Sequence, residues 1–176
     1  LTVSSNDAAM ALAQAYDKKQ LGESEYVAAI NKTALFTDLM QQRARDLGMY
    51  DTYFGDPSGL SVINQSTLGD VAVLVEYLAR QHPEILSITT KREQTILERK
   101  SMTRRTLLNI NKFAGRSDFL GGKTGYTDEA GGNLVSLFSY QGSRYLIIVL
   151  GTTDRFGETE KLFSWLSQRL SVSALP

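Results

Sequence analysis

The sequence predicts an α+β fold, in which a helical part is followed by an antiparallel sheet and by a last helix that packs on the sheet. Two observations support this. Apolar residues recur at helical spacing between about 4 and 90, whereas three strand-like apolar runs, separated by short turns, lie between 123 and 152. No repeat or linker interrupts the chain. We therefore expect one domain over 1–176, with its helical part at about 4–90 and its sheet and last helix at about 91–172.

Helix signals divide the first half of the chain. A polar cluster ahead of an alanine-rich run predicts a capped helix ending near Tyr16. A second helical pattern covers 24–47, with a break near Thr33, and Gly48 ends it. The glycines, proline and aspartates between 51 and 65 predict turns, and a third helix runs from about Ser66 to the His82–Pro83 pair. We assign His82 to structure, at this helix end.

Strand signals dominate the second half. The runs 123–127, 133–140 and 144–152 predict an antiparallel meander, and 158–170 predicts the last helix. The run 146–150 is continuously apolar, which predicts a central strand covered on both faces. The segment 93–108 is mixed, with a β-like centre and a basic turn at Arg104–Arg105.

Composition excludes several kinds of function. Nineteen basic and nineteen acidic residues give a formal net charge of zero, so neither a polyanion such as nucleic acid nor an anionic membrane is indicated as a partner. The chain has no cysteine and a single histidine, which excludes thiol nucleophiles, iron–sulfur clusters and two-histidine zinc motifs. No apolar run reaches the roughly 18 to 20 residues of a membrane span. We predict neither a metal nor a cofactor.

Two short motifs have a structural and a functional interpretation. Gly121–Gly125 reads Gly-Gly-Lys-Thr-Gly, but a phosphate-binding loop would need a glycine at 117, where Ser117 stands, and a helix afterwards. The triplet from Lys123 to Gly125 instead suits a strand edge, where a cation and a missing side chain could receive a peptide as an added strand. Ser4-Ser5-Asn6 precedes a helix, so its side chains could simply cap that helix. Taken alone, each motif favours the structural interpretation.

Together the two motifs point to one enzyme class. An S-x-N triplet opening a helix, followed far downstream by K-T-G on a strand, is part of the signature of penicillin-binding proteins and serine β-lactamases. The chain resembles the D-alanyl-D-alanine carboxypeptidases, the low-molecular-mass penicillin-binding proteins of serine peptidase type. Residues similar to that family occur in its order along most of the chain, at 4–9, 47–49, 52, 54, 56–60, 66–67, 70, 109–112, 121–127, 130–131, 149–151 and 155–156.

The resemblance implies a fold and an activity. The fold would be that of the serine β-lactamases and penicillin-binding-protein transpeptidases. The activity would be removal of the terminal D-alanine from peptidoglycan stem peptides through an acyl-serine, with β-lactams acylating the same serine outside the cytoplasm. The implied roles are proton transfer and charge for Ser4 and Lys123, substrate amide binding for Asn6, and substrate binding for Thr124, Gly125, Tyr126, Thr127 and Arg155.

The chain departs from the family pattern in two places. None of its eight lysines has a serine three residues before it, so the S-x-x-K nucleophile motif is absent. We interpret the chain as lacking an N-terminal segment, and expect it to be inactive alone, with its exposed edges binding that segment or another copy. Gly157 stands where some members have a further basic residue, which leaves the carboxylate-binding group open. The alternatives are a β-lactamase or esterase on the same fold, and a non-catalytic cell-wall peptide-binding module.

Overall fold

The computed structural model describes residues 1–172, which form two compact units. One unit comprises Ser5–Gln81; the other comprises Leu1–Ser4 together with the chain from His82 onward. The boundary after Gln81 assigns the segment 83–90, expected in the helical part, to the unit that contains the sheet. The expectation of one domain over 1–176 stays a prediction.

The unit Ser5–Gln81 is helical, as its apolar spacing predicts. Its first two helices are separated by Gly22, whose φ of +78° suits glycine. The break expected near Thr33 is present, and Gly48 follows the third helix with a φ of +83°, as a C-terminal glycine should. The helices are α1 (Asn6–Leu21), α2 (Glu23–Ala28), α3 (Ala34–Asp46) and α4 (Leu68–Gln81).

A buried carboxylate determines where α3 begins. Asp17 on α1 is 1% exposed and accepts the backbone N–H groups of Leu35 at 2.9 Å and Phe36 at 2.8 Å. These donors lie in the first turn of α3, where backbone N–H groups have no partner within the helix. Thr33, the residue before α3, makes no side-chain cap, so the cap comes from a residue distant in sequence.

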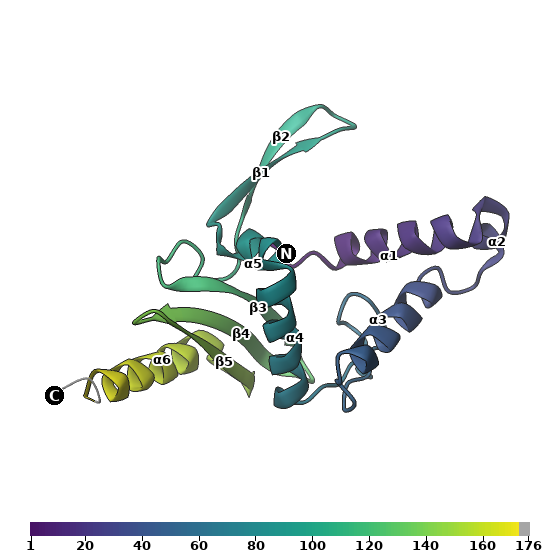
Figure 1. The fold of residues 1–176 in the computed structure, drawn as a ribbon. Helices are drawn as coiled ribbons and strands as arrows, with labels where there is room; N and C mark the ends of the chain where they lie inside the picture. The colour runs from purple at the N-terminus through teal and green to yellow at the C-terminus, as the bar shows by residue number, and fades with distance from the viewer. Residues whose placement is uncertain (173–176) are drawn as a thin grey trace. The chain divides into compact units, whose positions relative to one another are not determined.

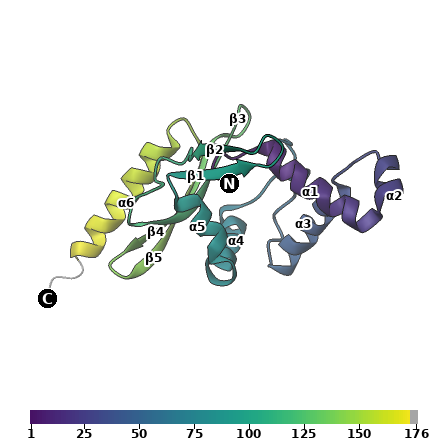
Figure 2. The ribbon, with the colours of Figure 1, turned by 90° about the horizontal axis from the view of Figure 1, so that it is seen from above.

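The second unit contains two sheets. The first is the hairpin β1 (Glu93–Glu98) and β2 (Thr103–Leu108). The second is an antiparallel sheet in the order β3-β4-β5, confirming the predicted meander (Figure 1). Helix α5 packs on β3, and α6 packs along β4 and β5, as Figure 2 shows from above. The remaining elements are α5 (Pro83–Thr90), β3 (Phe119–Thr127), β4 (Gly131–Tyr140), β5 (Ser143–Thr152) and α6 (Arg155–Val172).

Aromatic residues form the core between the sheet and α6. Phe138 is fully buried and contacts Phe163 of α6 with ring centroids 4.5 Å apart. Phe113 packs edge-on against Phe138 at 5.4 Å, an orientation that aromatic quadrupoles favour. The Arg116 guanidinium lies over this cluster and bonds Asp118 twice, at 2.9 and 2.7 Å. This packing holds β3 and β4 in place, and β3 carries the K-T-G triplet.

Two sequence expectations in this unit are wrong. Within the described residues β5 is an edge strand and β4 is central, so the apolar run 146–150 is not a central strand. Ile147 and Val149 are buried, whereas Leu150 is 46% exposed, so the run is not fully covered on both faces. Arg104 and Arg105 lie in β2, and the turn of the hairpin is at 99–102 instead. The mixed segment 93–108 is a regular hairpin, which cross-strand pairing stabilises despite weak local signals. Of the described helices, none combines the length and apolar character needed to cross a membrane.

Candidate active site

Strand β3 presents the K-T-G triplet with alternating side chains. Lys123 and Gly125 are exposed on one face, whereas Thr124 between them is 4% exposed, as period-two alternation predicts. The protein itself does not require glycine at position 125, since a methyl group there would lie at an ordinary contact distance, 3.7 Å, from the Cβ of Asn133. Only the glycine leaves the strand surface beside Lys123 free for another backbone.

Ser4 and Lys123 meet although 119 residues separate them. Lys123 Nζ donates to Ser4 Oγ at 2.5 Å, and also to the carbonyl oxygen of Thr124. The segment before Ser4 is held by a hydrogen bond from Ile110 N to the carbonyl of the buried Thr2, at 3.1 Å. Ser4 has a φ of +49°, a left-handed conformation uncommon outside glycine. Such a strained backbone at a polar contact is typical of functional sites.

The charge of Lys123 is destabilised in this environment. The neighbouring protein removes water from its ammonium group, although part of the side chain reaches solvent, and this lowers the pKa of Lys123. The positive charge of Arg155 lowers that pKa further. Arg155 itself donates Nη1 to the carbonyl oxygen of Gly125 at 2.8 Å, which fixes its position at the start of α6.

One edge of β3 is unpaired in the sheet. Gly122 N donates to Thr89 Oγ1 of α5 at 3.0 Å, so its N–H points away from β4. Because alternate residues of a strand direct their backbone groups to the same edge, the N–H groups of Thr124 and Tyr126 share this direction. Within the described chain no strand pairs with this edge. A peptide could therefore bind beside Thr124 and Tyr126 through backbone hydrogen bonds.

Side-chain hydrogen bonds order the last residues of β3 and the turn that follows them. Thr127 Oγ1 accepts the N–H of Ala130 at 3.0 Å, which leaves its hydroxyl proton available to a ligand. Tyr126 is 64% exposed and donates its hydroxyl to Asp128 at 3.1 Å, which raises the pKa of Tyr126.

The residues of the Ser4-Ser5-Asn6 triplet have different roles: one caps helix α1, and another contacts Lys123. Ser5 is the N-cap of α1, and its Oγ accepts Ala8 N at 3.1 Å, so capping accounts for Ser5 and not for Ser4. Asn6 is the first residue of α1 in the other compact unit. The structure thus brings together Ser4, Lys123, Gly125 and Arg155, while the role of Asn6 stays a prediction.

Thr89 is a site residue that the sequence did not indicate. It is buried, and it orients the β3 edge through Gly122, 33 residues away. Neither its type nor its neighbours on α5 signal this contact, because it depends on packing between α5 and β3. His82 stands just before α5, with Nδ1 3.2 Å from Glu84 Oε1.

Comparison with known proteins identifies the family. The model of the D-alanyl-D-alanine carboxypeptidase family matches residues 1–154 of the chain. The chain belongs to this family. DacC, a D-alanyl-D-alanine carboxypeptidase of Escherichia coli, is 35% identical over 166 residues, which cover 92% of this chain and 37% of DacC. A D-alanyl-D-alanine endopeptidase of Pseudomonas aeruginosa is 31% identical and matches 100% of this chain and 54% of its own length.

Solved structures show the same fold. Penicillin-binding protein D2 of Listeria monocytogenes, in its cefotaxime-bound form, matches with a TM-score of 0.73 and 35% identity. The match covers 93% of this chain and 62% of that protein. The α+β fold of this D-alanyl-D-alanine carboxypeptidase family member is therefore the penicillin-binding-protein fold, as predicted. The chain thus spans only 37% and 54% of the lengths of these two curated relatives.

Proposed function

We propose that this chain carries the proton-transfer group and the substrate-binding strand of a serine-type D-Ala-D-Ala carboxypeptidase. The observation that supports this most directly is the 2.5 Å hydrogen bond between Lys123 Nζ and Ser4 Oγ, beside the unpaired edge of β3. Family membership supplies the reaction class. Since S-x-x-K is absent from these 176 residues, the attacking serine in this proposal belongs to none of them.

In the proposed reaction the serine oxygen attacks the carbonyl carbon of the peptide bond between the last two D-alanines. Its proton passes to the adjacent lysine of the S-x-x-K motif, and that lysine then replaces the proton that Ser4 gives to the leaving amine. The tetrahedral intermediate collapses to an acyl-serine ester, the C–N bond breaks, and the amine of D-alanine leaves with a proton. Water then hydrolyses the ester and regenerates the serine. Because the Lys123 ammonium donates to Ser4 Oγ, the Ser4 hydroxyl proton is free to point elsewhere, so Ser4 can donate it to the leaving amine.

The peptide would lie along the β3 edge as an added strand. Gly125 allows its close approach, and the Tyr126 N–H, directed to this edge, is our candidate for one oxyanion donor. Thr127 has a free hydroxyl proton, and Arg155 has guanidinium N–H groups beyond the one that bonds Gly125, so both suit the terminal carboxylate. Thr124 contributes through its backbone, since its side chain is buried.

The remaining roles follow from the reaction class. Asn6 would hydrogen-bond a substrate amide. The substrate would be a peptidoglycan stem peptide ending in D-Ala-D-Ala, and β-lactams would acylate the same serine. Because this substrate lies outside the cytoplasm, we place the protein on the extracytoplasmic side of the membrane.

Intact-mass spectrometry after incubation with benzylpenicillin tests this proposal. It is run on this chain and on the product of the complete open reading frame that encodes it. We expect an adduct on the complete product only. Lys123→Gln in that product should slow acylation at least 100-fold, because it removes the charge that holds Ser4 and faces the substrate.

Lys112→Gln serves as the matched control, since it removes an exposed lysine from the same unit and should leave acylation unchanged. An unchanged rate in Lys123→Gln would refute the assigned role. No adduct on either protein would favour a non-catalytic peptide-binding module, and rapid loss of the adduct would favour a β-lactamase.

A further inference from the structure

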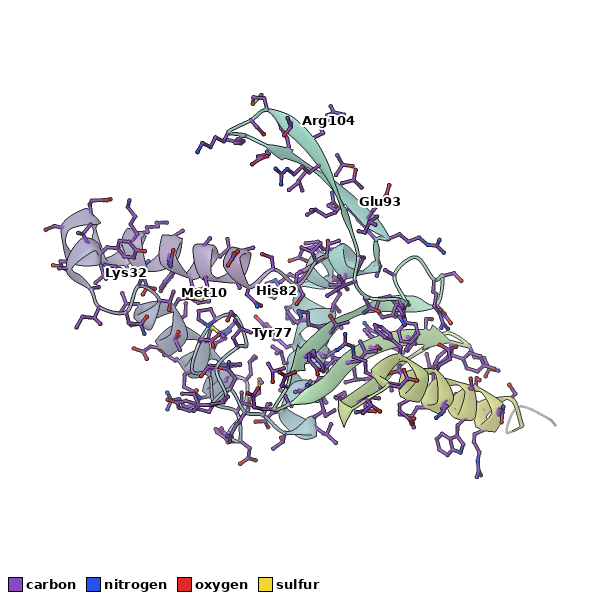
Figure 3. The ribbon with its side chains drawn as sticks, turned by 180° about the vertical axis from the view of Figure 1, so that it is seen from behind. Met10, Lys32, Tyr77, His82, Glu93 and Arg104 are labelled. Carbon is purple, nitrogen blue, oxygen red and sulfur yellow. The ribbon has the colours of Figure 1, made fainter. Side chains whose placement is uncertain are left out.

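The β1–β2 hairpin extends away from the β3-β4-β5 sheet of its unit. Figure 1 shows it standing clear of that sheet, and Figure 3 labels Glu93 near its base and Arg104 toward its tip. Its two strands pair with each other over their whole length and make only slight contact with any other described helix or strand. A lone two-stranded sheet is marginally stable in water. Its apolar side chains therefore have no core of their own.

Apolar side chains are nevertheless exposed along the hairpin, both at its base, where Leu108 is 67% exposed, and toward its tip. Ile96 is 41% exposed, Leu97 is 51% exposed and Met102 is 69% exposed. Ile96 pairs with Arg105, and Leu97 pairs with Arg104, so each face of the hairpin presents an apolar side chain beside an arginine. Exposed apolar groups flanked by cations are the composition of an interfacial surface.

Positive charge is also segregated to this part of the chain. The hairpin, residues 93–108, contains four basic and two acidic residues, a formal charge of +2 in a chain whose net charge is zero. At the tip, Arg105 pairs with Glu98 at 3.1 Å. Arg99, Lys100 and Arg104 form no ion pair with any of the residues 1–172. Three cations without an ion pair in the described part of the chain are therefore gathered near the tip of the hairpin, although the chain as a whole is neutral.

We propose that the tip of this hairpin binds an anionic lipid surface. Arg99, Lys100 and Arg104 would contact lipid phosphates, while Leu97 and Met102 enter the boundary between headgroups and acyl chains. A soluble anionic polymer would satisfy the charges alone. The exposed apolar side chains favour a lipid surface, because a lipid surface, unlike a soluble anionic polymer, removes them from water.

Vesicle co-sedimentation at low salt tests the proposal. The chain is mixed with vesicles of phosphatidylcholine alone or with about one third phosphatidylglycerol. We expect binding to the anionic vesicles only, weakening as salt is raised. The triple variant Arg99→Gln/Lys100→Gln/Arg104→Gln should bind about 100-fold more weakly, since each cation near such a surface contributes a factor of about five.

A matched variant removes three positive charges elsewhere. Lys19→Gln/Arg45→Gln/Arg144→Gln has the same net charge as the triple variant, and should retain nearly full binding. The double variant Leu97→Ser/Met102→Ser keeps every charge and should lose at least tenfold in vesicle binding. Circular dichroism verifies that each variant is folded.

Three results would overturn the proposal. The first is equal binding to both vesicle types, and the second is equal loss in the two triple variants. The third is unchanged vesicle binding by Leu97→Ser/Met102→Ser, with equally tight binding to soluble heparin. That third result would assign the hairpin to an anionic polymer.

Discussion

The cap that Asp17 places on α3 allows a quantitative prediction. Its carboxylate accepts two backbone N–H groups, at 2.9 and 2.8 Å, in a position 1% exposed to solvent. A hydrogen bond to a charged group contributes about 1.5 kcal/mol at the lower end of its range. Asp17→Ala should therefore lower the free energy of unfolding by about 3 kcal/mol. Asp17→Asn keeps one acceptor oxygen and should lose about half of that amount.

Urea unfolding followed by circular dichroism at 222 nm measures this loss. With an m-value of about 2 kcal/mol/M, Asp17→Ala should lower the midpoint by about 1.5 M. Amide hydrogen exchange should accelerate at Leu35 and Phe36, the two donors. Asp46→Ala, an exposed carboxylate at the other end of α3, is the control. Equal midpoints for Asp17→Ala and Asp46→Ala would refute the reasoning.

Three further predictions concern the sheet and its site. A methyl group at Gly122 would lie 2.2 Å from the carbonyl oxygen of Val135, so Gly122→Ala should cost at least about 3 kcal/mol in urea unfolding. The Ser136 hydroxyl is fully buried without a hydrogen-bond partner, so Ser136→Ala should leave the unfolding free energy unchanged or raise it by about 1 kcal/mol. Arg155→Gln removes a positive charge that lowers the pKa of Lys123, so that pKa should rise toward its ordinary value of 10.5 in an NMR titration of the lysine side chain. A Ser136→Ala loss above 1 kcal/mol, a tolerated Gly122→Ala, or an unchanged or lower Lys123 pKa would each contradict its prediction.

Local sequence signals determined most of the elements. The alternation from Lys123 to Gly125 reports which side chains face outward, because a strand has a period of two. The spacing of apolar residues identified α4, and a glycine identified the end of α3. These signals act between near neighbours, so the sequence alone is enough to read them. The family resemblance of the motifs predicted the fold class in the same way, from residues that stand in order along the chain.

Contacts between distant residues were decided only by the tertiary structure. The sequence did not indicate that β5 lies at an edge, that Asp17 caps a helix beginning 17 residues later, or that Thr89 orients the edge of β3. Nor did it reveal that Arg104 belongs to a strand of an extended basic hairpin. Each of these depends on which helices and strands pack together. The residues that make such contacts are far apart in sequence, so local sequence patterns do not reveal them. The residue types at the site could therefore be identified from the sequence, whereas the hydrogen bond between Ser4 and Lys123 depends on the tertiary fold.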